Sequence, residues 1–309
     1  MPATARDDPG DAATPVEPDV VVLPAFAAGD VTAEVDLPHE VEPWLEEYAF
    51  DRELAVPGAN APVRYTDDGV AITPTGMGKT DAAATVTALL RAPGLDCSDA
   101  AFLTVGIAGA SPEAGTLGSV FIADHVVDWD RKQRWDGAAD DDPVETMRLL
   151  PYRPRDYAYR LDDDFVERAR EWASDVSLRD TERAREHRER YSQDAARGAP
   201  TVAVGTTLCG DEFWHGARHA EAARWLVDRY DAGEYATTEM EDFGTAAALD
   251  RFDRLESYLS VRGVVNFDRP PEGRTAREVI DEDLDAATVD LGLENAFRVG
   301  SRIVDRLVE

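Results

Sequence analysis

The chain has 309 residues, 63 of them acidic and 32 basic, which gives a formal net charge of −31. A charge of this sign repels phosphate backbones and argues against nucleic-acid binding. Because no apolar run reaches the 18 residues of a membrane-spanning helix, we expect no membrane insertion by this chain. Lysine occurs only at Lys79 and Lys132. Since concentrated salt screens the self-repulsion of so acidic a chain, the composition predicts a protein of a high-salt cytoplasm.

Composition also divides the chain into segments. Residues 1–18 (MPATARDDPGDAATPVEP) lack an apolar stretch, so we predict a disordered acidic tail rather than a signal peptide. Residues 19–309 predict one domain. Within it, a charged segment at about 162–197 predicts a helical insertion with little sign of a turn, because Phe165, Ala169 and Trp172 fall on one helical face.

Strands and helices alternate along the rest of the domain. Apolar and β-branched runs predict strands at 20–23, 70–73, 101–105, 118–123, 201–205 and 258–265. Helical patterns cover 80–91, 210–226 and 293–308, and another helix starts at 246–249; we expect Thr80 or Asp81 to cap the first. The alternation predicts an α/β fold with ligands at the carboxyl ends of its strands.

Two glycine motifs follow predicted strands. Thr75-Gly76-Met77-Gly78-Lys79 lies at a strand-to-helix turn, where free backbone amides can bind an anion or a hydroxyl, but it lacks the P-loop spacing. Gly106-Ile107-Ala108-Gly109 lets a ligand approach the backbone closely. A tight turn and close packing explain these glycines equally well.

The most distinctive motif is acidic: Thr238-Glu239-Met240-Glu241-Asp242. A carboxylate accepts hydrogen bonds from paired hydroxyls while a thioether lies against a ring, so the block suits a sugar. A solvated acidic loop is the alternative interpretation.

Other polar and aromatic residues are less specific. Phe213 can stack on a planar ring or pack in the core. Asn266 and Asp268 follow the last predicted strand and can read a base or simply form a turn. Cys97 and Cys209 lack metal-ligand spacing, so we predict no metal site.

Taken in order, these motifs resemble the nucleoside phosphorylase and nucleosidase superfamily, and most closely the purine nucleoside permease family. The matching stretches are TGMGKTDAAA, GIAGASPEAGTLGS, EFWHG, TTEMED and NFDRP, within the range from Val20 to Leu307. The resemblance implies a single-domain nucleoside phosphorylase-like fold, with a mixed central sheet flanked by helices, and a homo-oligomer.

The resemblance also implies a set of substrate-binding residues. Met240 and Glu241 would hold the ribose, Phe213 would stack on the purine, and Asn266 would hydrogen-bond the base. Thr75, Gly76 and Gly106 would line the pocket for phosphate or water. Arg262 matches a strand arginine of the nucleosidases. Asp268 is a nearby alternative acid. No cofactor is implied.

The chain departs from the superfamily at the catalytic positions. No arginine precedes Gly106 in its strand or follows the first strand, so phosphate as a co-substrate is disfavoured. Nucleosidases need a carboxylate near the first strand to activate water, whereas this chain has Phe26-Ala27 there; Asp30 and Glu34 are the candidates to replace it. Asn266 cannot donate a full proton to the leaving base.

Three hypotheses follow. The first is a cytoplasmic purine nucleoside-binding protein for inosine, guanosine or adenosine, involved in nucleoside uptake or handling. The second is an N-ribosyl hydrolase or phosphorylase, in which Glu241 stabilises a ribosyl cation and Asn266 or Asp268 assists departure of the base. The third is a structural descendant that has lost the ligand.

Overall fold

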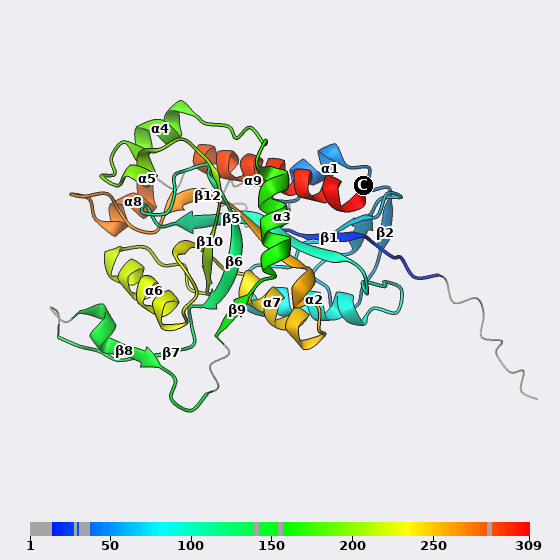
Figure 1. Cartoon of the computed structure of the whole chain (residues 1–309), viewed down its shortest axis with the longest axis horizontal. Helices are drawn as coiled ribbons and strands as arrows, with labels where there is room; N and C mark the ends of the chain where they lie inside the picture. Colours follow the sequence, from blue (N-terminus) through cyan, green and yellow to red (C-terminus); the bar gives the residue numbers. More distant parts are fainter. Residues whose placement is uncertain (1–13, 28–29, 31–37, 139–141, 154–156, 283–285) are drawn as a thin grey trace, which may run out of the picture.

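The computed structural model describes residues 14–27, 30, 38–138, 142–153, 157–282 and 286–309 (Figure 1). Its strands are β1 Val20–Leu23, β2 Arg52–Leu54, β3 Val63–Tyr65, β4 Val70–Ile72, β5 Ala101–Ala110, β6 Val120–Asp128, β7 Lys132–Arg134, β8 Met147–Leu149, β9 Ala158–Arg160, β10 Val202–Cys209, β11 Tyr235–Glu239 and β12 Tyr258–Phe267. Its helices are α1 Glu42–Glu47, α2 Lys79–Arg91, α3 Asp163–Ala173, α4 Glu182–Arg188, α5 Asp194–Arg197, α6 Ala217–Arg229, α7 Asp242–Arg251, α8 Ala276–Glu282 and α9 Ala286–Val308.

One mixed sheet forms the centre of the described residues. Its strands run in the order β11-β10-β6-β12-β5-β1-β4-β3-β2, with β9 beside β6, while β7 and β8 form a separate hairpin. Helices lie on both sides of the sheet, with α9 on one side and α2 and α7 on the other (Figure 1). The predicted α/β fold with a mixed central sheet is therefore confirmed.

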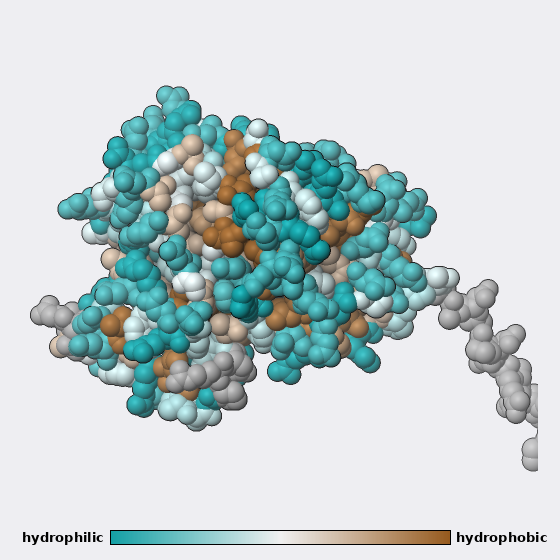
Figure 2. All heavy atoms as spheres, in the orientation of Figure 1, coloured by the Kyte–Doolittle hydropathy of each residue, from teal (hydrophilic) through white to brown (hydrophobic). Residues whose placement is uncertain are grey.

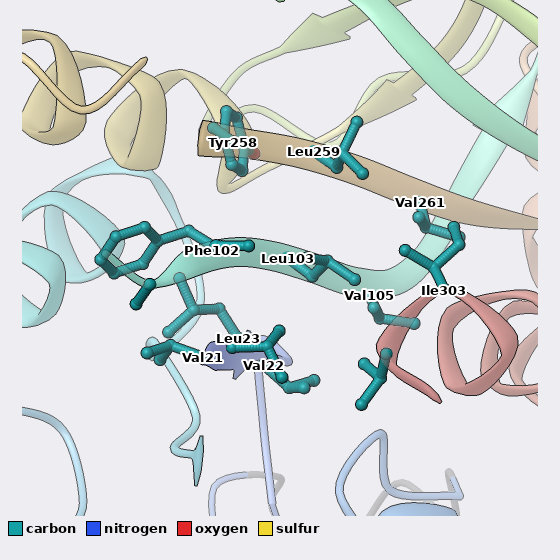
Figure 3. Packing of buried hydrophobic residues seen from close by; sticks show 14 of the residues in the cluster. Val21, Val22, Leu23, Phe102, Leu103, Val105, Tyr258, Leu259, Val261 and Ile303 are labelled. Carbon is teal, nitrogen blue, oxygen red and sulfur yellow. The ribbon is translucent and has the colours of Figure 1, made fainter. Parts of the chain in front are cut away.

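The core lies where β1, β5 and β12 run parallel. Val22, Leu103 and Leu259 face one another across these strands in register, and all three are fully buried (Figure 3). Ile303 of α9 packs beside Val105 in the same cluster. Because helices cover both faces of parallel strands, such strands are apolar along their whole length, which is why the run at 20–23 was recognisable.

The sheet closes on itself at one end. Strand β11 pairs in parallel with β10 and antiparallel with β5, so that β5, β12, β6, β10 and β11 form a closed ring. Thr238 of β11 and Asn266 of β12 both lie opposite Gly109 of β5. The closure therefore brings three motifs that are far apart in the sequence to one place.

Three predicted details differ from the structure. Helix α2 is preceded by Gly78 at φ +94, without a cap from Thr80 or Asp81; the distant Asp211 carboxylate accepts from the Lys79 amide at 2.8 Å instead. The segment at 162–197 forms three separate helices, α3, α4 and α5, rather than a run with little sign of a turn. Residues 1–13 of the predicted tail lie outside the described residues, but Val16 already bridges to Leu95.

A glycine in β12 permits close packing of α9 against the sheet. A Cβ on Gly263 would collide with the carbonyl oxygen of Gly292 and lie 3.1 Å from Ala296 Cβ. We expect Gly263→Ala to lower the free energy of unfolding by about 1–3 kcal/mol, because backbone atoms cannot turn aside. Urea denaturation measures the change. Gly94→Ala, whose Cβ would make an ordinary 3.4 Å contact with Leu54, is the control, and an equal loss in both variants would contradict the argument.

Candidate active site

The acidic motif forms the junction between β11 and α7. Strand β11 ends at Glu239, and α7 begins at Asp242, with Glu241 at its N-cap position. The Glu239 carboxylate accepts from the backbone amides of Glu241 and Asp242 at 2.7 and 2.8 Å. Glu239 therefore caps the helix with its side chain and leaves the Glu241 carboxylate directed elsewhere.

Glu241 faces the first glycine motif. Its Oε1 accepts from the Gly78 amide at 3.0 Å, and its Oε2 lies 3.4 Å from Nη1 of Arg262. The side chain is almost fully buried, and Met240 beside it is half-buried. The structure thus brings together Glu241, Arg262 and the TGMGK loop, as the sequence interpretation requires.

The Asp242 carboxylate fixes the position of the Arg262 guanidinium. Asp242 is fully buried and accepts from Nε of Arg262 at 3.2 Å and from its Nη2. It also accepts from the hydroxyls of Thr104, Tyr258 and Ser260. A carboxylate with this many donors fixes the orientation of the guanidinium, whose Nη1 points towards Glu241 and the Ile107 carbonyl.

A carboxylate missing from the sequence interpretation completes the site. Glu40, which lies just before α1, is 2% exposed; its Oε2 accepts from the Ala25 amide at 2.5 Å and its Oε1 from the Ile107 amide at 3.0 Å. Its carboxylate therefore contacts the backbone just after β1 and in the middle of β5. A carboxylate near the first strand is what the comparison with nucleosidases led us to expect. Asp30 is exposed and accepts from the Ala27 amide, and Glu34 lies outside the described residues.

Gly106 makes room for this arrangement. A Cβ at Gly106 would collide with Oε1 of Glu40 and lie 3.0 Å from Nη1 of Arg262, so both side chains occupy the space that any other residue would fill. Burial raises the pKa of Glu40 to about 7, although Arg262 and the two backbone amides lower it. Burial and neighbouring carboxylates also raise the pKa of Glu239 and of Glu241.

A second part of the site lies further along β12. Asn266 is four residues from Arg262, about 13 Å along a strand, and a β-bulge between Val264 and Asn266 shifts the register there. The Asn266 side chain packs over Gly109 near Thr238. Asn266 and Phe213 line one small cleft, and Phe213 is 56% exposed.

Three predicted site residues are placed differently. The Asp268 carboxylate is buried beside Arg269, away from the cleft of Asn266, and burial raises its pKa to about 7. Thr75 is fully buried, and its hydroxyl faces the carbonyls of Pro24 and Gly76. Gly76, at φ +84, donates its amide to the Ala25 carbonyl. The polar groups of Thr75 and Gly76 thus bond to backbone carbonyls and stabilise the glycine loop.

The electrostatics of the site favour a cation over an anion. Arg262 lies within 3.4 Å of carboxylate oxygens of Glu239, Glu241 and Asp242, and Glu40 adds a fourth carboxyl group nearby. A guanidinium surrounded in this way has little capacity left for a phosphate dianion. Among the described residues, no group of three or more His, Cys, Asp or Glu side chains is arranged to hold a metal ion.

Solved structures define the fold class. The 5′-methylthioadenosine/S-adenosylhomocysteine nucleosidase from Neisseria meningitidis, in complex with methylthio-immucillin-A, matches with a TM-score of 0.58 at 17% identity over 94% of this chain and 99% of that one. Futalosine hydrolase of Helicobacter pylori matches with a TM-score of 0.61 at 17% identity, over 94% and 98%. The chain therefore has the nucleoside phosphorylase and nucleosidase fold that was expected.

The sequence defines the family. Residues 17–309 match the family described as purine nucleoside permease. A probable purine nucleoside permease of Schizosaccharomyces pombe is 30% identical over 263 residues, which cover 76% of this chain and 74% of that protein. A purine nucleoside permease of Candida albicans is 26% identical over 299 residues, or 87% and 72%. The chain belongs to the purine nucleoside permease family.

Among the described helices, not one combines the length and the apolar character needed to cross a bilayer.

Proposed function

We propose that this protein binds a purine nucleoside and hydrolyses its N-glycosidic bond. The placement of Glu40 carries the proposal: a buried carboxyl group lies near Arg262 and Glu241, and its pKa is about 7. A general base works best when its pKa lies near the working pH. Glu40 is therefore suited to take a proton from a water molecule that attacks C1′ of the ribose.

The other side chains have complementary roles in this proposal. Glu241 accepts from the ribose hydroxyls, and Met240 lies against the sugar ring. The excess of carboxylates around Arg262 stabilises the positive charge that develops on the ribose as the bond to the base breaks. Phe213 stacks on the purine, and Asn266 hydrogen-bonds its edge. The length of β12 between Arg262 and Asn266 separates the sugar end from the base end.

Water is the acceptor that the electrostatics support. A phosphate dianion placed beside Glu40, Glu241 and Asp242 would meet three carboxyl groups around one guanidinium. A neutral water molecule carries no such penalty and needs a base, which Glu40 supplies.

The test is release of the base. The protein is incubated with inosine, guanosine or adenosine in molar KCl, with and without phosphate, and free base is measured by chromatography. Equal release in both buffers supports hydrolysis. Release that requires phosphate would make the protein a phosphorylase, and binding in calorimetry without any release would make it a nucleoside-binding protein.

The ribose subsite is tested by binding. We expect Glu241→Ala to weaken nucleoside binding by about 10- to 100-fold, because hydrogen bonds to a charged group are lost. Isothermal titration calorimetry at molar KCl measures the change. Glu234→Ala, which removes an exposed glutamate just before β11, is the matched control. Normal binding by the Glu241 variant would show that the sugar lies elsewhere.

We also propose that the protein works as a homo-oligomer in a salt-rich cytoplasm. Hydrophilic side chains cover most of the face seen in Figure 2, and the net charge is −31. Because salt screens repulsion among these charges, we expect the thermal unfolding midpoint to rise between about 0.1 and 2 M KCl. A midpoint that is constant or falls would contradict this, and sedimentation in the same buffers gives the oligomeric state.

A further inference from the structure

Hydrolysis as proposed above leaves one proton unassigned. When the bond between C1′ and N9 breaks, the purine takes the electron pair and becomes a far better leaving group if a proton reaches its ring. An asparagine amide at the base, as in Asn266, hydrogen-bonds but transfers no proton. The Asp268 carboxyl group is buried next to Arg269 rather than in the cleft of Asn266. Neither of these two residues therefore supplies the proton.

The cleft at the base end contains imidazole groups. It is lined by residues from α4 and the turn after it, the loop before α6, the end of β12, and α8: His187, Tyr191, Phe213, His215, Asn266, Phe267, Val279 and Ile280. Helices α4 and α8 lie at the same end of the molecule (Figure 1). The charged segment at 162–197 thus supplies part of the wall of the cleft.

His187 is the more deeply buried of the two imidazoles. It is 3% exposed, stacks on Tyr191 with ring centroids 6.2 Å apart, and meets the edge of Phe267, the neighbour of Asn266, at 6.4 Å. The Tyr191 hydroxyl in turn donates to the Arg269 carbonyl, which ties this part of the segment to the end of β12. The imidazole is therefore packed into the wall of the cleft that Asn266 also lines.

We propose that His187 is the general acid that protonates the leaving purine. As the water oxygen bonds to C1′, the C1′–N9 electron pair moves onto the purine, the His187 imidazolium gives its proton to N7, and Glu40 receives the proton of the water. After the products leave, Glu40 releases a proton to solvent and His187 takes one up. One turnover consumes one water molecule and no net proton.

His215 is less suited to this role. It also lines a neighbouring groove with Arg134, Arg218 and His219. In that groove the pKa of His219 is lowered by burial and by the positive charge of Arg134. His215 thus borders two grooves, whereas His187 is enclosed in the cleft that Asn266 lines.

Two substrates distinguish acid catalysis from a structural role. Inosine needs a proton on its leaving group, whereas p-nitrophenyl β-D-ribofuranoside releases a stable phenolate without one. We expect His187→Gln to lower kcat for inosine by about 100-fold or more and kcat for the phenyl riboside by less than about threefold. Equal losses on both substrates would overturn the assignment while leaving the proposed hydrolysis intact.

His215→Gln, in the same cleft, is the matched control, and we expect it to change the two rates by the same factor. A second measurement needs neither a folded variant at position 187 nor turnover. The imidazole nitrogen shifts of the wild-type protein are recorded by NMR, and His187 is assigned by elimination with variants of the other four histidines. Its signal should move with hypoxanthine but not with 7-deazahypoxanthine, which lacks N7; an identical response to both would overturn the proposal.

Discussion

Replacing Glu40 by glutamine is expected to abolish nucleoside cleavage and to leave nucleoside binding nearly unchanged. Glutamine keeps the shape of the side chain and can still accept from the Ala25 or Ile107 amide, but it cannot take a proton from water. Loss of a general base lowers kcat by about 100- to 10,000-fold. Base release measured by chromatography, together with calorimetric titration of the same nucleoside, separates the loss of chemistry from a loss of binding.

The control for this variant is a neighbouring glutamate. Glu42 lies two residues further on, in α1, and is exposed. We expect Glu42→Gln to cleave nucleosides at the wild-type rate. If Glu40→Gln were also fully active, the water would be activated by another group, and the proposed mechanism would be wrong.

Glu40→Gln should also change how the free energy of unfolding depends on pH. The pKa of Glu40 is raised from 4.5 to about 7 by burial, so the folded protein binds a proton at this site more tightly than the unfolded chain. The contribution of Glu40 to stability is therefore fully present below pH 4.5 and is lost as pH rises to about 7. In Glu40→Gln this loss is absent. Wild-type cleavage should rise over the upper part of that range as the base becomes ionised.

Much of the fold was predictable because periodicity and glycine placement are local signals. The strand at 20–23 was predicted with the bounds of β1, and the helices at 80–91 and 293–308 lie within α2 and α9. These elements are apolar throughout or amphipathic over several turns. By contrast, β11 is only five residues long, which is too short for a periodic pattern, and no strand was predicted there.

The site was predictable where motif and structure coincide. Glu241 and Arg262, which the resemblance assigns to the substrate, lie 3.4 Å apart because β11 and β12 both lie beside β5. Glu40 was missed because its role depends on a tertiary contact: its carboxylate accepts from the backbone amide of Ala25, 15 residues earlier in the chain. Nothing in the sequence around position 40 distinguishes this glutamate from the other acidic residues nearby. The need for glycine at position 106, where a Cβ would collide with Glu40, likewise depends on a tertiary contact that the sequence does not reveal.

Asp242→Asn is expected to cause the largest loss of stability. Asp242 is completely buried, and the fully buried guanidinium of Arg262 is oriented by it. Removing one partner of a buried ion pair costs about 3–5 kcal/mol, because the remaining charge stays desolvated and less well compensated. The amide group of asparagine would also point a donor at hydroxyls of Tyr258 or Ser260 that now donate to Asp242.

Urea denaturation at neutral pH measures this effect, and the same helix provides the control. Asp250 lies in α7 and is exposed, so Asp250→Asn should change the free energy of unfolding by less than about 0.5 kcal/mol. Glu239 and Glu241 remain near Arg262 in this variant. Because the charge of Asp242 raises the pKa of both, its removal favours their ionised forms, which offset part of the lost attraction to Arg262. If Asp242→Asn were as stable as Asp250→Asn, those two carboxylates would suffice to hold the guanidinium. The orientation of Arg262 would then not depend on Asp242, and the Thr104, Tyr258 and Ser260 hydroxyls would not serve to position the site.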